Sequence, residues 1–302
     1  MEYEVIADGL RFPEGPVVMS DGSVIVVEIE SKKITRCWPG GKRETVAEPG
    51  GGPNGLAIGP DGKLWCTNNG GFIYHERDGL LIPGHCPPDY SGGRIERIDL
   101  ETGEVEVVAT EFEGRPLKGP NDLVFDKAGN LYFTDLGKSY PTHRDTGGVY
   151  FMAAGSDKVQ ELDYNHISPN GIGLSPDEAT VYFADTMSAR VWAFDLEKPG
   201  VAKQATPFST GRVVAGMPDL RYFDSLAISA AGNVCVATIL RGGITTVQPD
   251  GQHSHTAFPD PFVTNIAFGG EDMKDAYITL SGTGQLIKCR WPEAGLKLNF
   301  NA

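Results

Sequence analysis

The chain has 302 residues, and 40% of them are hydrophobic, so it is long and apolar enough to bury a sizeable core. Its 39 glycines and 21 prolines exceed the average usage of about 12% for the two residues together. This excess disfavours an all-helical protein and suits many short strands joined by turns. The formal net charge of −14 argues against binding to nucleic acid or to a membrane surface, because both carry negative charge.

The chain carries no targeting or membrane-spanning pattern. Its first residues lack the basic segment and long apolar run of a signal peptide, and no stretch approaches the roughly 20 apolar residues of a membrane span. The five cysteines are scattered, and no two have the Cys-x-x-Cys spacing of a zinc or redox site. These features predict a cytoplasmic protein with reduced, mostly buried thiols.

A repeated pattern runs along the whole chain. Each copy has a polar residue, a short apolar strand, a turn and a second strand. The copies cover residues 13–27, 53–68, 120–135, 169–185, 223–238 and 263–279. With two further strand-like segments, each unit of about 50 residues matches one propeller blade of four strands. The sequence therefore predicts an all-β fold in which residues 1–302 form a single six-bladed β-propeller domain.

The leading polar residues of the six copies are candidate metal ligands. In a propeller the first strand of every blade lines the central channel, so equivalent positions meet around the axis. The expected ring consists of Glu14, Asn54, Asn121, Asn170, Asp224 and Asn265. Carboxylate and amide oxygens suit Ca²⁺, Mg²⁺ or Mn²⁺. Asn and Asp before a strand also cap turns, and we expect Asn54 and Asn265 to have this structural or supporting role.

No other catalytic motif competes with this ring. The chain lacks a GxSxG nucleophile elbow, a Walker phosphate loop and an HExxH zinc motif. A metal in the ring could polarise a carbonyl or phosphoryl oxygen and organise a water, and a neighbouring carboxylate could accept the proton.

Several motifs resemble those of the senescence-marker-protein, gluconolactonase and luciferin-regenerating-enzyme family. They lie at residues 12–16, 120–124, 168–171, 184–186 and 290–300. The resemblance covers essentially the full chain and implies a six-bladed β-propeller with one divalent metal in its channel. The implied ligands are Glu14, Asn121, Asn170 and Asp224, and the resemblance also implies Asp224 as general base in the hydrolysis of sugar lactones.

The fifth blade departs from the family pattern. The family commonly has Pro-Asp-Gly before this strand, whereas this chain has Phe223, Asp224 and Ser225. A Pro-Asp pair occurs upstream at residues 218–219, but no strand pattern follows it, so we assign the acid to Asp224. The neighbouring Phe223 could reshape the pocket and so change the substrate.

Two predicted loops and two cations supply further candidates for substrate binding. The Pro- and Gly-rich segment 69–93 is predicted to be a loop, either a lid or a surface that contacts another molecule, and its Tyr74, His75, His85 and Tyr90 could reach substrate. A second loop, 138–144, contributes Tyr140 and His143. Arg115 and Lys118 precede Asn121 and could hold a hydroxyl, a carboxylate or an oxyanion, or simply be solvated. Asn54 completes the candidate substrate-binding set.

These observations favour metal-dependent hydrolysis of an aldonolactone, such as glucono- or xylonolactone, to the hydroxy acid. Asp224 would activate the attacking water. We prefer Ca²⁺ as the single metal, with Zn²⁺, Mn²⁺, Mg²⁺ and Fe²⁺ as alternatives. The expected partner is a small-molecule lactone, with neither nucleic acid nor membrane, and the oligomeric state is left open. The alternative functions are a phosphotriesterase or fluorophosphatase on the same site and a non-catalytic binding propeller.

Overall fold

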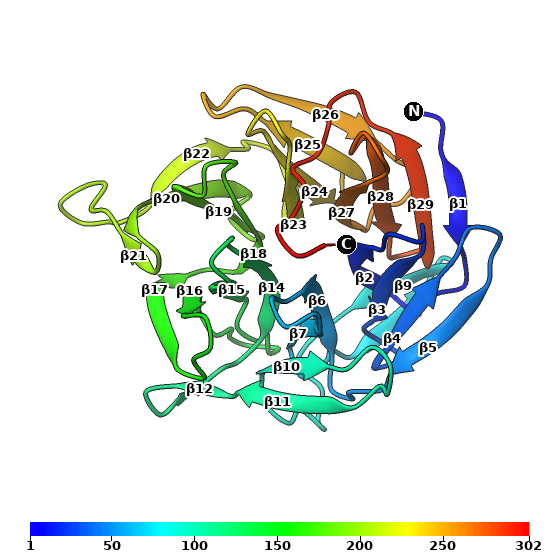
Figure 1. Cartoon of the computed structure of the whole chain (residues 1–302), viewed down its shortest axis with the longest axis horizontal. Coiled ribbons are helices and arrows are strands. Elements are labelled where there is room, and N and C mark those ends of the chain that lie inside the picture. Colours follow the sequence, from blue (N-terminus) through cyan, green and yellow to red (C-terminus); the bar gives the residue numbers. More distant parts are fainter. Residues whose placement is uncertain (302) are drawn as a thin grey trace.

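The computed structural model describes residues 1–301, which contain strands and turns but no helix. Six sheets of four or five strands surround a central channel like the blades of a propeller (Figure 1). The predicted six-bladed β-propeller is therefore confirmed. In blades one to five the chain runs from the innermost strand outward, and in every blade neighbouring strands are antiparallel.

The blades follow one another in chain order. Blade one contains β2 (Pro13–Val18), β3 (Val24–Glu28), β4 (Lys33–Cys37) and β5 (Arg43–Ala47). Blade two contains β6 (Pro53–Ile58), β7 (Leu64–Asn68), β10 (Arg94–Ile98) and β11 (Val105–Ala109). Blade three contains β14 (Pro120–Phe125), β15 (Leu131–Asp135), β16 (Gly147–Met152) and β17 (Val159–His166).

The second half of the chain forms the other three blades. Blade four contains β18 (Pro169–Leu174), β19 (Thr180–Asp185), β20 (Arg190–Lys198) and β22 (Arg212–Gly216), and β21 (Val201–Ala202) pairs with β20. Blade five contains β23 (Tyr222–Ile228), β24 (Val234–Ile239), β25 (Gly243–Val247) and β26 (His253–Ala257). Blade six contains β27 (Val263–Gly269), β28 (Asp275–Leu280), β29 (Gln285–Arg290) and β1 (Glu4–Ala7).

Blade six joins the two ends of the chain. Its outermost strand, β1, comes from the beginning of the sequence and pairs antiparallel with β29, so that Val5 lies opposite Ile287. The repeat pattern did not predict this strand, because β1 stands outside the six copies.

Apolar side chains between neighbouring sheets hold the blades together. Strand β15 is buried along its whole length, and Trp65 of blade two packs edge-on against Phe125 of blade three with ring centroids 5.4 Å apart. Turn residues close the hairpins: between β14 and β15, the Asp126 carboxylate accepts hydrogen bonds from the backbone N–H groups of Ala128 and Asn130. Gly129 in the same turn has a φ of 84°, which favours glycine.

We call the face on which the six inner strands begin the upper face, and the opposite one the lower face. Segment 69–93 lies on the upper face, and the predicted loop contains a short hairpin that the sequence analysis did not predict, β8 (Tyr74–Arg77) with β9 (Leu80–Pro83). A second short hairpin joins β12 (Glu111–Phe112) to β13 (Arg115–Pro116). The segment after β29 lies on the lower face, and its end reaches the centre of the propeller (Figure 1).

No helix long and apolar enough to cross a membrane occurs in residues 1–301.

Candidate active site

Every inner strand is irregular at the same place, near its beginning. The register with the second strand of the blade shifts between Glu14 and Val17, Pro53 and Leu56, Pro120 and Leu123, Pro169 and Ile172, Phe223 and Leu226, and Val263 and Asn265. Such bulges interrupt the normal alternation of side chains and turn them in a new direction. The six leading polar residues lie in or beside these bulges.

These six residues, which we call the polar ring, are all buried. The ring consists of Glu14, Asn54, Asn121, Asn170, Asp224 and Asn265. Glu14 and Asn265 connect blades one and six, because the Asn265 amide Nδ2 donates a hydrogen bond of 2.6 Å to Glu14 Oε2. The same oxygen accepts the backbone N–H of Gly15 at 2.5 Å. Asn265 therefore orients the Glu14 carboxylate, which is the supporting role expected from the sequence.

On the other side of the polar ring, Asn170 connects blade four to blade five. Its Nδ2 donates to Thr186 Oγ1 at 3.0 Å, and its Oδ1 accepts a long hydrogen bond of 3.4 Å from Ser225 Oγ. Two other oxygens of the polar ring, Glu14 Oε1 and Asn121 Oδ1, are buried without any hydrogen-bond partner in the described residues. Buried oxygens of this kind are normally hydrogen-bonded, so their presence points to a ligand.

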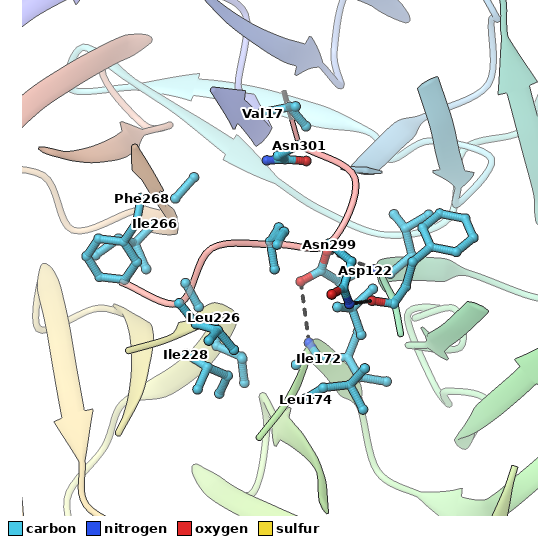
Figure 2. A pocket seen from close by; sticks show the side chains of 18 of the residues that line it. Val17, Asp122, Ile172, Leu174, Leu226, Ile228, Ile266, Phe268, Asn299 and Asn301 are labelled. Carbon is cyan, nitrogen blue, oxygen red and sulfur yellow. Dashed lines mark hydrogen bonds between the residues drawn. The ribbon is translucent and has the colours of Figure 1, made fainter. Parts of the chain in front are cut away.

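Just below the polar ring, the inner strands approach one another closely. A Cβ atom on Gly15 would lie 2.4 Å from the backbone oxygen of Asn54, and one on Gly171 would lie 2.5 Å from the backbone nitrogen of Leu226. In blade three, Asp122 occupies the position that Gly15 has in blade one and Gly171 has in blade four. Its Oδ1 accepts the backbone N–H of Leu123 at 2.9 Å, and its Oδ2 accepts that of Ile172 at 3.4 Å (Figure 2).

Asp122 is a third buried carboxyl beside the site, and the sequence analysis missed it. The change from Pro-Asn-Gly in the second and fourth copies to Pro-Asn-Asp in the third could have identified it. Burial raises the pKa of both Asp122 and Asp224 to about 7. Burial also raises the pKa of Glu14 well above its usual value, and the charge of Asp224 adds to this effect.

The donor set fits a divalent cation. None of the ion pairs in residues 1–301 involves Glu14, Asp122 or Asp224, so their charges lack a cationic side chain to balance them. Within the same residues, no three Asp, Glu, His or Cys side chains lie close enough to form a metal site. A cation at the polar ring would therefore need amide oxygens as well, and the unpartnered Asn121 Oδ1 offers one.

Comparison with known proteins identifies the family. Residues 12–282 match the model of the SMP-30/Gluconolactonase/LRE-like region. The chain belongs to this family. It is 28% identical over 280 residues to a protein named gluconolactonase from Zymomonas mobilis, an alignment that covers 82% of this chain and 70% of that protein.

Solved structures of the family share the fold. A gluconolactonase from Xanthomonas campestris superimposes with a TM-score of 0.74 at 20% sequence identity, covering 95% of this chain and 89% of the other. A protein from Agrobacterium tumefaciens described as a calcium-binding protein, regucalcin, superimposes with a TM-score of 0.71 at 20% identity, covering 97% of this chain and 99% of the other. These two superpositions show a shared fold.

Three candidate substrate-binding residues of this family member come together on the upper face. His85 Nδ1 lies 3.4 Å from Ser139 Oγ, which joins segment 69–93 to the loop after β15. In that loop, Tyr140 and His143 stack with ring centroids 4.4 Å apart. Lys118 is half-buried two residues before Pro120, and no hydrogen bond or ion pair within residues 1–301 uses its ammonium group. The polar ring itself contains Asn54.

The structure places Arg115 elsewhere. Its guanidinium forms an ion pair with Glu161 and lies 3.9 Å from the ring centroid of Tyr164, and both partners are on β17, the outermost strand of blade three. Its role as a substrate-binding residue is therefore not favoured, because its charge is already paired. Asp219, the alternative acid of blade five, pairs with Arg221 and Arg241, whereas Asp224 is the member of the polar ring.

Proposed function

We propose that the chain is a metal-dependent enzyme that hydrolyses a sugar lactone to the hydroxy acid, with the polar ring as its active site. The observation that carries this proposal is the pair of buried, unpartnered oxygens, Glu14 Oε1 and Asn121 Oδ1, in the same polar ring as Asp224. Family membership supports it, and so does the Zymomonas mobilis relative, which is named gluconolactonase.

Glu14, Asn121, Asn170 and Asp224 are the residues that would hold a divalent cation, with Ca²⁺ preferred because all four offer hard oxygen ligands. When bound, the cation would act as a Lewis acid that makes a lactone carbonyl carbon more electrophilic. Asn265 serves this arrangement by fixing the orientation of the Glu14 carboxylate.

Asp224 would act as the general base. Burial raises the pKa of its carboxyl to about 7 in the metal-free protein, and a bound cation would lower this pKa, so the carboxylate would be ionised and able to accept a proton at neutral pH. Its carboxylate would accept a proton from water as the water oxygen bonds to the carbonyl carbon. The ester C–O bond of the lactone then breaks, and the departing alkoxide takes the proton from Asp224. One water is consumed, and one hydroxy acid is formed.

The polar groups of the upper face would bind the rest of the substrate. Lys118 offers an ammonium group without a partner in the described residues, and His85, Tyr140 and His143 offer polar atoms in the two adjoining loops. A sugar lactone carries several hydroxyl groups that such side chains can recognise.

A hydrolysis assay tests this proposal. The purified protein is freed of metal with a chelator, reloaded separately with Ca²⁺, Zn²⁺, Mn²⁺, Mg²⁺ or Fe²⁺, and offered glucono-, xylono-, galactono- and arabinonolactone alongside an organophosphate. We expect lactone hydrolysis that disappears without metal and returns with one of the ions. Full activity after exhaustive metal removal would contradict the metal dependence, and faster turnover of the organophosphate would contradict the lactone assignment.

A further inference from the structure

A tyrosine from segment 69–93 packs beside the beginning of strand β2, which carries Glu14, and its hydroxyl group has no hydrogen-bond partner in the described residues. Tyr74 begins the hairpin β8–β9 and packs against Phe12, with ring centroids 5.3 Å apart. Phe12 lies two residues before Glu14 of the polar ring. The hydroxyl oxygen of Tyr74 is buried, and it has no hydrogen-bond partner in the described residues.

The charges that act on this hydroxyl are those of carboxylates, and it keeps its proton. Burial raises the pKa of Tyr74 well above its usual value, and the negative charges of Glu30, Glu14 and Asp224 raise it further. Two of these three acids belong to the polar ring. The Glu30 carboxylate is already bound by the Arg11 guanidinium at 2.8 Å. A buried hydroxyl group normally has a hydrogen-bond partner. The protonated and unpartnered hydroxyl of Tyr74 can therefore donate a hydrogen bond to an acceptor on a bound ligand.

The hairpin that carries Tyr74 is fixed at one end to blades six and one. The backbone N–H of Leu81 donates to the carbonyl of Gly282 at 2.8 Å, in the connection between β28 and β29. Arg11 Nη1 donates to Glu76 Oε1 at 2.8 Å. Segment 69–93 therefore extends from blade two past the beginning of blade one to blade six, which brings Tyr74 against Phe12.

Lys138 fixes the other end of the segment. Its ammonium is buried and donates to the backbone carbonyls of Asn69 at 2.8 Å and Gly71 at 2.5 Å. It also lies 4.2 Å from the ring centroid of Phe72. Near the end of the segment, Tyr90 donates its hydroxyl to the carbonyl of Lys118 at 2.6 Å. The position of Tyr74 is thus set before any substrate binds, as preorganised catalysis requires.

We propose that the Tyr74 hydroxyl donates a hydrogen bond to the lactone carbonyl oxygen as that oxygen gains negative charge during water attack. This inference rests on the proposed lactone hydrolysis and adds a catalytic residue that the polar ring does not contain. Asp224 takes the proton from water and the cation would polarise the carbonyl, so the unpartnered Tyr74 hydroxyl would add a neutral hydrogen-bond donor for the developing oxyanion. The proton stays on Tyr74 throughout.

The test compares Tyr74→Phe with the wild type. We expect kcat to fall about 10- to 100-fold while KM stays within about twofold, because the lost interaction forms only in the transition state. The inhibition constant of a cyclic phosphonate that mimics the tetrahedral oxyanion should rise by a similar factor, while the bound metal content stays unchanged. The melting temperature should stay the same or rise, since the replaced hydroxyl has no hydrogen bond to lose.

Tyr132→Phe is the control, on strand β15 of blade three. Its hydroxyl accepts a structural hydrogen bond from the backbone N–H of Gly200 at 3.1 Å, so this variant should melt at a lower temperature with kcat unchanged. A Tyr74→Phe variant with kcat within about twofold of the wild type would overturn the role of Tyr74 and leave lactone hydrolysis intact. A rise in KM with constant kcat would also overturn it. If the wild type hydrolyses no lactone, the proposed function and the role of Tyr74 both fail.

Discussion

The upper and lower halves of the channel are built from the same six strands and have opposite chemistry. At the upper end, the strands begin with the buried polar ring, two of whose oxygens lack partners. At the lower end, the same strands line a cavity of about 150 Å³ with apolar side chains, among them Val17, Leu174, Ile228 and Phe268 (Figure 2). The first residues of each inner strand form the candidate active site, and the last residues contribute apolar packing.

The lower half is closed by the end of the chain, as Figure 2 shows. The backbone N–H of Leu296 donates to the carbonyl of Ile228 at 2.8 Å. Asn299 Nδ2 donates to the carbonyl of Phe125 at 3.1 Å, and Phe300 packs edge-on against the Phe125 ring. Substrate is therefore expected to reach the polar ring from the upper face, where the candidate binding residues lie. If this division is correct, substitutions in the upper half should change activity, and those in the lower half should change stability.

The largest effect is expected from Asp224→Asn in the upper half. Loss of the carboxylate removes the proposed base and one metal ligand, so kcat should fall by about a thousandfold or more. The melting temperature of the metal-free variant should not fall, because the variant no longer buries this ionisable carboxyl. The measurements are steady-state kinetics and calorimetry. Activity within tenfold of the wild type would contradict the division between the two halves.

A pair of variants on strand β18 sharpens the comparison, because Asn170 belongs to the upper half and Leu174 to the lower. Leu174→Ala removes a buried side chain and should lower the free energy of unfolding by about 2–4 kcal/mol, while activity stays within about threefold. Asn170→Ala should show the reverse pattern, with a large loss of activity and metal affinity. Denaturant unfolding and lactone hydrolysis measure the two effects. Equal effects of both variants on activity would show that the halves are coupled.

The smallest effect concerns the pH dependence of stability, through Asp122. Because the folded protein has a raised pKa at Glu14, Asp122 and Asp224, these groups bind more protons in the folded state than in the unfolded state between about pH 4 and pH 7. Stability of the metal-free protein should therefore fall as the pH rises through this window. Asp122→Asn should weaken that decline, measured as melting temperature against pH.

A bound divalent cation should stabilise the protein with the opposite pH dependence. Protons and metal compete for the same carboxylates, so the added ion should raise the melting temperature more at pH 8 than at pH 5. A metal-free protein whose melting temperature does not change between pH 4 and pH 8 would contradict the raised pKa values.

The repeat made the polar ring predictable before the fold was known. A Pro-Asn pair before a short apolar strand recurs in several copies, and the propeller topology converts this spacing into a shared position around one axis. Asp224 could be assigned despite its changed neighbours, because a strand follows it and none follows Asp219. The roles of these residues, the single domain and the cytoplasmic location stay predictions.

Other features depend on tertiary contacts that local patterns do not encode. Arg115 was placed at the substrate by its sequence distance from Asn121, yet its partner Glu161 lies 46 residues further along the chain. The hairpin β8–β9 was missed because its four-residue strands lack a clear alternation of polar and apolar residues. Lys138 resembles any loop lysine in the sequence, and only the folded chain brings the carbonyls of Asn69 and Gly71 to its ammonium.

The closure of blade six has a consequence for how the protein is made. Strand β1 pairs with β29, and Glu14 receives the amide of Asn265 across the same junction. Ser281 Oγ also donates to the carbonyl of Pro13 there, at 2.5 Å. These contacts join the two most distant parts of the sequence. During synthesis the ring can therefore close only after the last blade has been made. The polar ring is complete only when the circle is closed, so a nascent chain that lacks blade six cannot carry the whole site.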